Sequence, residues 1–169
     1  DLCLVGSEMC IRDRFMHMLP KSDTWQNKEE HNVNYKKINL QKLNIVTHGK
    51  YDNELLGGIA TGLLAQIYDA GGKEYLTPEM HFCAISVKTK NYPPNFHVDD
   101  WGEGRLKVLG ILNSDWNSEK DGGGFICNGV AYKLNPTDFL IFDSNQTHAN
   151  DTITSDKDRY AIDYMLTAK

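Results

Sequence analysis

The chain has 169 residues, of which 40% are hydrophobic and 24% are charged, so it is long and apolar enough for one globular domain with a sizeable core. The formal net charge is -5 at pH 7 and no cluster of lysine and arginine interrupts this acidity, which disfavours nucleic acid and anionic lipid as partners. No apolar run approaches the roughly 20 residues that cross a bilayer, so we expect no membrane partner.

The four cysteines, Cys3, Cys10, Cys83 and Cys127, show neither CxxC spacing nor a dense pattern. Secreted domains that depend on disulfides carry a larger number of cysteines, and their spacing is more regular. We therefore interpret these residues as free thiols in a reducing compartment and expect a cytoplasmic protein.

The first 14 residues, DLCLVGSEMCIRDR, differ in character from the rest of the chain. They contain a short apolar patch, but their acidic residues and late arginines do not make a signal peptide. The segment resembles the translated sequencing-adapter read-through found at the ends of assembled metagenomic genes. We therefore expect residues 1–14 not to be native and assign residues 15–169 to a single domain.

The next part of the chain contains one clear helical pattern. Residues 15–34 are polar and aperiodic, which predicts an irregular or flexible segment, and residues 35–44 are typical of a short strand. Residues 53–72, NELLGGIATGLLAQIYDAGG, are predicted to form a helix because their apolar residues recur at three- and four-residue steps. Gly71 and Gly72 should end it, since glycine accepts the left-handed conformation at a helix C-terminus.

Two glycines, Gly57 and Gly58, lie inside this predicted helix. Each weakens a helix interior by about 1 kcal/mol relative to alanine. Close packing of the helix against a sheet would explain them.

The second half of the chain changes to strand periodicity. Residues 81–90, HFCAISVKTK, alternate between a more apolar and a less apolar side, as a half-buried strand does. Further strand-like segments follow, separated by turn-rich pieces: 105–113, 123–135, 138–143 and 159–166. A helix followed by many short strands with no helices between them predicts a mainly β fold, an antiparallel sandwich or barrel with helices on one side.

His97 and Asp99 are candidate metal ligands in the segment NFHVDDW. Side chains two residues apart on a strand project to the same face, so the two can converge on one point. An imidazole nitrogen and a carboxylate oxygen together suit a divalent transition metal. An HxD tripeptide alone is a weak signal, and a surface histidine beside acidic residues is the ordinary alternative.

His148 and Arg159 extend this pattern. His148 lies 51 residues after His97 (148 − 97), just beyond the apolar strand FLIF, and would complete a set of two histidines and one carboxylate. Such a set leaves three metal positions open, which is the arrangement of non-haem Fe(II) oxygenases. Arg159 follows 11 residues later (159 − 148) at the start of a predicted strand, where a guanidinium can bind a carboxylate in bidentate fashion. A loop histidine and a solvated arginine are the alternatives.

An ordered series of short motifs accompanies these residues. It comprises Tyr92-Pro93, HVD at 97–99, GR at 104–105, LNxDW at 112–116, the glycines 122–124, NPTDFLIF at 135–142, His148 and RYAI at 159–162. In this series the chain resembles the Fe(II)/2-oxoglutarate-dependent oxygenases of the prolyl 4-hydroxylase-like branch. The resemblance implies a single oxygenase domain over 15–169, whose double-stranded β-helix (jelly roll) core spans about 80–168 and carries one or more N-terminal helices on the sheet.

The resemblance also implies roles for individual residues. His97, Asp99 and His148 would bind iron, and Arg159 would bind the C5 carboxylate of the co-substrate 2-oxoglutarate. Tyr92 matches a tyrosine that lines the co-substrate pocket, and it would also border the substrate.

Some positions depart from the family pattern. Relatives often have a tyrosine that assists in binding the C5 carboxylate, and this chain has Ile111 at that position. Lys107 or Thr147 could take over its role. Alternatively, Arg159 binds the carboxylate with less help. Trp101 is a candidate wall of the substrate site, with a core or rim aromatic as the equal alternative. The loop between Tyr92-Pro93 and His97 is short, which leaves the substrate geometry open.

The activity implied by the resemblance is hydroxylation of an unactivated C–H bond with Fe(II), 2-oxoglutarate and O2, and ascorbate is a candidate reductant. The favoured substrate is a prolyl residue of a peptide or protein, followed by a free amino acid or small metabolite. Nucleic-acid oxidation is disfavoured because position 165 is Met, where relatives that demethylate nucleobases carry a second arginine. Two alternatives belong to other classes of function. One is a non-catalytic jelly-roll module that binds a metal or another ligand, and a more remote one is a zinc hydrolase.

Overall fold

The structure is a computed structural model that describes residues 16, 19, 26–29, 39–136 and 138–169. The prediction about residues 1–14 therefore lies outside the described residues, as do most of 15–34 and the first part of the strand predicted at 35–44. Everything said below about side chains concerns the described part of the chain.

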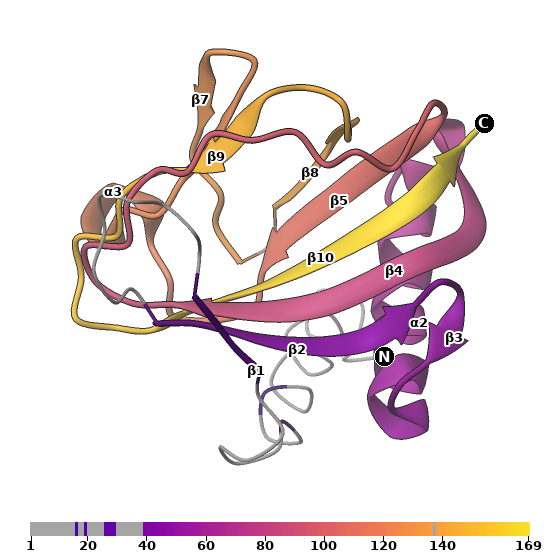
Figure 1. Ribbon diagram of the computed structural model, residues 1–169, viewed down its shortest axis with the longest axis horizontal. Helices are drawn as coiled ribbons and strands as arrows, with labels where there is room; N and C mark the ends of the chain where they lie inside the picture. The colour runs from indigo at the N-terminus through magenta and orange to yellow at the C-terminus, as the bar shows by residue number, and fades with distance from the viewer. Residues whose placement is uncertain (1–15, 17–18, 20–25, 30–38, 137) are drawn as a thin grey trace, which may run out of the picture.

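The main sheet is antiparallel and has the order β1-β2-β4-β10-β5-β8, with β3 pairing with β2 (Figure 1). Its strands are β1 (Gln26–Glu29), β2 (Asn39–Thr47), β3 (Lys50–Tyr51), β4 (Leu76–Lys88), β5 (Arg105–Ile111), β8 (Phe139–Asp143) and β10 (Arg159–Ala168). The two longest strands, β4 and β10, are paired in its centre, so they form the platform on which the other elements are arranged.

A smaller antiparallel sheet has the order β7-β6-β9 and consists of β6 (Phe125–Cys127), β7 (Val130–Tyr132) and β9 (His148–Asn150). Figure 1 shows β7 and β9 beyond the β5 and β8 end of the main sheet. A core cluster joins the two sheets and contains Tyr92, Leu109, Ile111, Trp116, Phe125, Cys127, Leu134, Phe142, Ile153 and Ala161. Antiparallel sheets that face each other across such a core form the predicted mainly β, double-stranded β-helix architecture.

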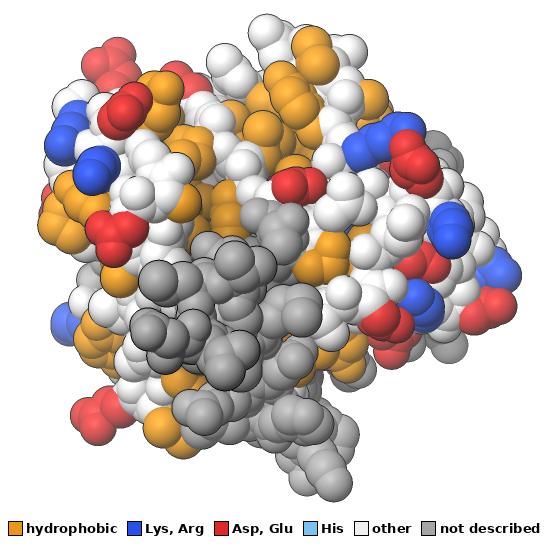
Figure 2. Space-filling model, turned by 180° about the vertical axis from the view of Figure 1, so that it is seen from behind, with side chains coloured by type: hydrophobic (Ala, Val, Ile, Leu, Met, Phe, Trp, Pro, Cys, Tyr) orange, Lys and Arg blue, Asp and Glu red, His pale blue; other side chains and the backbone are white. Residues whose placement is uncertain are grey.

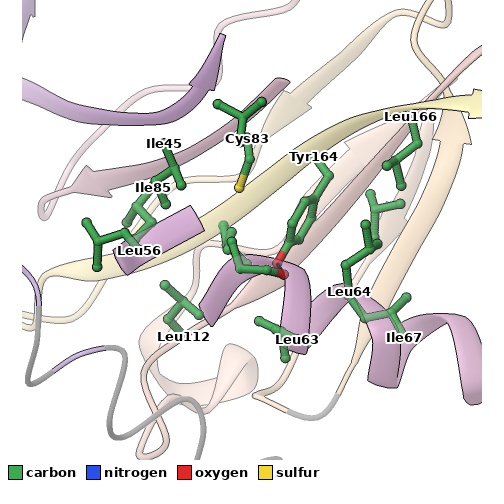
Figure 3. Packing of buried hydrophobic residues seen from close by; sticks show 14 of the residues in the cluster. Ile45, Leu56, Leu63, Leu64, Ile67, Cys83, Ile85, Leu112, Tyr164 and Leu166 are labelled. Atoms are coloured by element: carbon green, nitrogen blue, oxygen red, sulfur yellow. Dashed lines mark hydrogen bonds between the residues drawn. The ribbon is translucent and has the colours of Figure 1, made fainter. Parts of the chain in front are cut away.

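The predicted helix is confirmed as α2 (Glu54–Asp69), which packs on the opposite face of the main sheet. Asn53 caps it, because its side-chain oxygen accepts a hydrogen bond from the backbone N–H of Leu56 at 3.0 Å. Figure 3 shows the buried side chains between helix and sheet, where the Tyr164 hydroxyl donates to the carbonyl of Ala60 at 2.9 Å. After the helix, Gly71 has a φ of +128° and is followed by the 3-10 turn η1 (Gly72–Glu74), so the predicted glycine stop is confirmed.

Strand β10 has alternating faces that serve different cores. Ile162, Tyr164 and Leu166 point toward α2, whereas Ala161 belongs to the core between the sheets. Because side chains alternate along a strand, Arg159 and Asp163 share the inner face with Ala161. The face that carries charged residues is therefore the one enclosed by the smaller sheet.

The structure corrects several predicted strand boundaries. β4 begins at Leu76, upstream of the predicted start at 81, and the predicted strand 123–135 is two strands joined by a turn at Asn128-Gly129. Both turn residues have positive φ values (+48° and +78°), as a two-residue hairpin requires. The prediction of irregular structure was wrong for residues 26–29, which form β1 because β2 supplies their backbone partners. The short helix α3 (Ser118–Asp121) and the short strand β9 were not predicted.

The described residues also show how charge is distributed over the surface and which helices the chain forms. Basic and acidic side chains are interspersed on the face shown in Figure 2 instead of forming a patch of one sign. Among the helices of the described part of the chain, none combines the length and apolar character that crossing a bilayer demands. Cys83 and Cys127 are free thiols, as predicted, while the other two cysteines lie outside the described residues.

The two helix glycines have different surroundings, which allows a stability test. A Cβ on Gly57 would lie 2.2 Å from Cδ1 of Tyr51, whereas one on Gly58 would meet nothing within 4 Å. We expect Gly58→Ala to raise the free energy of unfolding by about 0.5–1 kcal/mol, because alanine is the better helix former. Gly57→Ala should lower the free energy of unfolding, because the Tyr51 ring must move. When Tyr51→Ala is combined with it, the clash is absent and the gain from alanine should return. Urea denaturation checks this, and equal effects of the two glycine variants would contradict the packing.

Candidate metal centre

His97 and His148 are brought together by backbone pairing. The N–H of His97 donates to the carbonyl of His148 at 3.0 Å, and the N–H of His148 donates to the carbonyl of His97 at 2.9 Å. Residues paired in this way project to the same side, and the two ring centroids lie 4.4 Å apart. The N–H of Asp99 donates to the carbonyl of Ser144 at 3.0 Å, so a third backbone bond joins the same two segments of the chain.

The three candidate ligands converge on one point. His97 Nε2 lies 3.6 Å from Asp99 Oδ1, and His148 Nε2 lies 3.4 Å from Asp99 Oδ2. All three ligand atoms lie within 4.8 Å of one another. Divalent transition metals such as zinc bind these nitrogen and oxygen atoms at about 2.0–2.2 Å, so ligand atoms around one cation lie about 3–4 Å apart. Only small side-chain adjustments would therefore be needed here. His97 is exposed, Asp99 half-buried and His148 buried, so the site opens on one side.

Both imidazoles are oriented by the same local hydrogen bond. Nδ1 of His97 lies 2.8 Å from the carbonyl of Asn95, and Nδ1 of His148 lies 2.8 Å from the carbonyl of Gln146. Because only a protonated Nδ1 can donate to a carbonyl, each Nε2 is left with the lone pair that binds a metal. The Nε2 of His148 is buried and has no hydrogen-bond partner. A buried acceptor without a donor is costly, and a cation at this position would remove the cost.

The Asp99 carboxylate is held ionised by its neighbours. Burial alone would raise its pKa, but the charge and the hydrogen bond of the Lys107 ammonium act in the opposite direction, and the pKa lies well below the usual range. Lys107 Nζ donates to Asp99 Oδ2 at 2.5 Å. Burial lowers the pKa of Lys107, but Asp163 and Asp99 raise it by more, so the net pKa is raised. The structure thus places Lys107 on a candidate metal ligand, and both groups are charged at pH 7.

Arg159 is fully buried at the start of β10 and only partly satisfied. Its Nη1 donates to Oδ1 of Asn150 at 2.9 Å, while Nε and Nη2 have no hydrogen-bond partner. Burial lowers the pKa of Arg159 to about 10, so the guanidinium stays charged at pH 7. Asn150 and His148 lie two residues apart on β9 and project to the same face. The unsatisfied side of the guanidinium therefore belongs to the same interior as the histidine and aspartate cluster.

Gly123 makes room for this arginine. Its φ is +64°, and a Cβ there would lie 2.9 Å from Cδ of Arg159 and 3.2 Å from Trp116. Any side chain would be strained by the backbone conformation and would also push against the arginine stem. The glycine run singled out in the sequence thus shapes the place where the guanidinium lies.

The remaining predicted site residues have varied surroundings. Tyr92 and Ile111 are buried in the core between the sheets. Trp101 is half-buried, and its ring lies 5.6 Å from Phe82 and 6.2 Å from His48, so it belongs to an aromatic cluster at the rim. Thr147 is exposed.

Sequence reasoning missed several polar residues of this interior. Lys88, Asn150 and Asp163 are each buried, and none of them was predicted as a site residue. Strand alternation could have found Lys88, because it falls on the less apolar side of the strand that was predicted at 81–90. Asn150 had no signal of its own, since β9 was not predicted.

Comparisons with known proteins support the fold. No protein-family model matches the sequence, and no curated protein sequence is similar to it. Three similar solved structures are a prolyl hydroxylase from Trichoplax adhaerens in complex with a hypoxia inducible factor peptide fragment, a prolyl-4-hydroxylase from Pseudomonas putida, and the non-heme alpha ketoglutarate dependent epimerase SnoN from nogalamycin biosynthesis. Each superposes on nearly the whole of this chain.

The first structure is 22% identical, with a TM-score of 0.63 over 96% of this chain and 79% of that chain. The second is 14% identical, with a TM-score of 0.57 over 99% of this chain and 89% of that chain. The third is 9% identical, with a TM-score of 0.67 over 96% of this chain and 74% of that chain. At these identities the likeness establishes the fold alone, the double-stranded β-helix that the sequence predicted.

The imidazole of His97 sets a pH limit for metal binding. Burial lowers its pKa, against a smaller opposing effect of its hydrogen bond to Asn95. A protonated imidazole cannot bind a metal, so protons compete with the metal for this nitrogen. Because the pKa is lowered, this competition should begin only below about pH 6.5, the value for free histidine. We expect the affinity for Mn(II), measured by calorimetry, to be steady between pH 8 and pH 7 and to fall below about pH 6. Asp99 stays ionised throughout.

Two variants control this experiment. His97→Gln should weaken Mn(II) binding at every pH, whereas His48→Gln, at the aromatic rim, should leave the pH profile unchanged. A loss of affinity that begins above pH 7, or none down to pH 4.5, would contradict the assignment of these ligands.

Proposed function

We propose that this protein is an Fe(II)- and 2-oxoglutarate-dependent dioxygenase that hydroxylates an unactivated C–H bond. The observation that carries the proposal is the buried Arg159, which keeps its charge while Nε and Nη2 lack acceptors. A buried cation of this kind calls for an anion, and a carboxylate matches the two adjacent N–H groups in geometry and charge. His148 and Asn150 place this unsatisfied guanidinium on the same side of β9 as the histidine and aspartate cluster.

The donor set of the cluster fits iron. His97, Asp99 and His148 offer two neutral nitrogens and one carboxylate oxygen, the facial set that leaves positions open for a co-substrate and oxygen. When bound, iron and 2-oxoglutarate would supply, with O2, the oxidising chemistry that no side chain can provide. A non-catalytic module gives no comparable account of a buried, charged arginine whose Nε and Nη2 lack acceptors.

The protein's own residues prepare the site in defined ways. The carbonyls of Asn95 and Gln146 hold the imidazoles in the tautomer that binds a metal. Lys107 engages Oδ2 of Asp99 and fixes the plane of the carboxylate, while its charge keeps Asp99 ionised. Arg159 is positioned before any ligand arrives, so little ordering cost accompanies its two hydrogen bonds.

The substrate that we propose is a prolyl residue of a peptide or protein. Two of the similar structures are prolyl hydroxylases, one of them in complex with a peptide fragment, and the motif series resembles the same branch. The exposed side of His97 gives a bulky substrate a route to the metal centre. Trp101 and Phe82 form an aromatic rim that could contact such a substrate.

Loss of the arginine should separate co-substrate binding from metal binding. Under anaerobic conditions, Fe(II) and 2-oxoglutarate should together produce a visible charge-transfer band in the wild type. In Arg159→Ala, Fe(II) affinity should persist while 2-oxoglutarate affinity falls by about 100-fold or more, because two hydrogen bonds to a charged group are lost. Arg159→Lys, which keeps the charge, should retain part of the affinity. Equal binding by wild type and Arg159→Ala would refute the role of the arginine.

Turnover tests the reaction and its substrate. Incubation with proline-containing peptides should yield succinate and a peptide heavier by one oxygen, as detected by mass spectrometry. The same peptides with alanine in place of proline should not be modified. If only free amino acids were modified, the substrate would be a small molecule and not a peptide. If no succinate formed under any condition, a non-catalytic binding module would be favoured.

A further inference from the structure

Lys107 contacts the same oxygen of Asp99 that faces a metal-binding imidazole. Its Nζ lies 2.5 Å from Oδ2 of Asp99, and Nε2 of His148 lies 3.4 Å from that oxygen. A divalent transition metal binds a carboxylate oxygen at about 2.0–2.2 Å, so a metal ion on Oδ2 could be no farther than about 4.7 Å from the ammonium. The lysine and a metal ion therefore compete for one carboxylate.

The repulsion between two such cations is only weakly screened. The side chains of Lys107 and Asp99 are 13% and 19% exposed. Charges of the same sign repel each other more strongly in a partly desolvated interior than in water, because the effective dielectric constant is lower. Dissolved salt also screens buried charges less than exposed ones. The contact between Lys107 and Asp99 is therefore unfavourable once a metal ion shares the carboxylate.

A second carboxylate, Asp163, lies on the same face of the sheet and within reach of Lys107. Strands β5 and β10 are paired side by side (Figure 1), and their register sets Leu109 opposite Asp163. Lys107 lies two residues before Leu109, so Asp163 is its diagonal neighbour, at about 7–8 Å, which a long side chain can span. Leu109 belongs to the core between the sheets, so both charged residues face the inner side.

Asp163 can receive the ammonium. It is buried, and among the ion pairs of the described residues Lys107 has one, with Asp99, and none includes Asp163. Its charge nevertheless acts on the lysine, because burial lowers the pKa of Lys107 while Asp163 and Asp99 raise it by more. Lysine carries its charge on a flexible four-carbon stem. The ammonium can therefore turn from one carboxylate to the other without a movement of the strands.

We propose that Lys107 is a movable counter-ion of the metal centre, which neutralises Asp99 in the metal-free protein and moves to Asp163 when a divalent cation binds. This inference rests on the metal site of the proposed function, but neither on its co-substrate nor on its substrate. Asp99 then has a positive neighbour in both states, so it is never left as an uncompensated buried charge.

Lys107 and Asp163 act through Asp99, so they are positioning residues, and their effects on metal binding are opposite. Lys107 weakens the binding of a metal ion, because its ammonium must be displaced from Asp99. Asp163 strengthens the binding, because it accepts the displaced ammonium. The effect of Asp163 therefore depends on the presence of the lysine.

Titration with Mn(II) alone, followed by calorimetry at one pH and ionic strength, tests this dependence. We expect Lys107→Met to bind Mn(II) about tenfold more tightly than the wild type, and Asp163→Asn about tenfold more weakly. In the Lys107→Met background, Asp163→Asn should change the affinity by less than about threefold, because no ammonium needs an acceptor. Lys90→Met is the matched control and should bind like the wild type, since Lys90 is exposed and ion-paired with Asp156 at 2.9 Å.

A crystal structure of the Mn(II) complex would show the position of the lysine directly. We expect Nζ of Lys107 to lie within about 4 Å of an Asp163 oxygen and to have left Asp99. An Nζ that stays on Asp99 while Mn(II) is bound would overturn the inference.

The outcomes of the titration separate the two proposals. Absence of Mn(II) binding by the wild type would remove the metal site, and with it both the proposed function and this inference. Equal effects of Asp163→Asn with and without Lys107 would overturn the inference alone, since Asp163 would then be a fixed charge. Weaker binding by Lys107→Met than by the wild type would also overturn it, because the lysine would then only hold Asp99 in place. If Lys107→Met does not fold, Lys107→Gln, which also lacks the charge, replaces it in the cycle.

Discussion

The candidate metal centre depends on two backbone hydrogen bonds between His97 and His148. These bonds join segments that lie far apart in the sequence, and they set both imidazoles on the same side of the chain pair. Asp99 lies two residues beyond His97 and is held by a separate backbone bond, which its N–H donates to the carbonyl of Ser144. Backbone pairing of this kind positions ligands more rigidly than side-chain contacts do, since each bond restrains two residues at once.

The alternating faces of β10 explain how one strand can support both a stable core and a charged interior. Tyr164 and its apolar neighbours on one face pack against α2, which supplies burial that stabilises the fold. The other face carries Arg159 and Asp163 into the space between the sheets. A charged interior would be hard to maintain in a domain with only one core, because desolvation of each charge costs free energy.

Two groups of buried charges, described around Asp99 and around Arg159, differ in how far their hydrogen bonds are satisfied. Asp99 and Lys107 compensate each other, and Asp163 adds to the stabilisation of the lysine. Arg159 has a neutral amide partner in Asn150, while its Nε and Nη2 lack hydrogen-bond partners. Functional sites commonly retain such unfavourable arrangements, which a ligand relieves.

Local patterns in the sequence determined the elements and the identity of most candidate residues. The spacing of apolar residues predicted α2, alternation predicted the long strands, and the positions of His97 and Asp99 two residues apart placed them on one face. These properties depend on the period of a helix or strand, which neighbouring residues set among themselves. Gly57 was likewise explained by packing against a strand, in its case against Tyr51.

Tertiary structure alone decided which distant residues meet. The three-residue strand β9, which carries His148, has no periodicity to read and exists because β6 and His97 pair with it. The opposition of Lys88 and Arg159 follows from the register of β4 and β10, and the contact of Lys107 with Asp99 joins β5 to the segment between β4 and β5. Register is set by the packing of both sheet faces at once, and a shift by one residue would exchange the faces. Such long-range information is not contained in any short stretch of the chain.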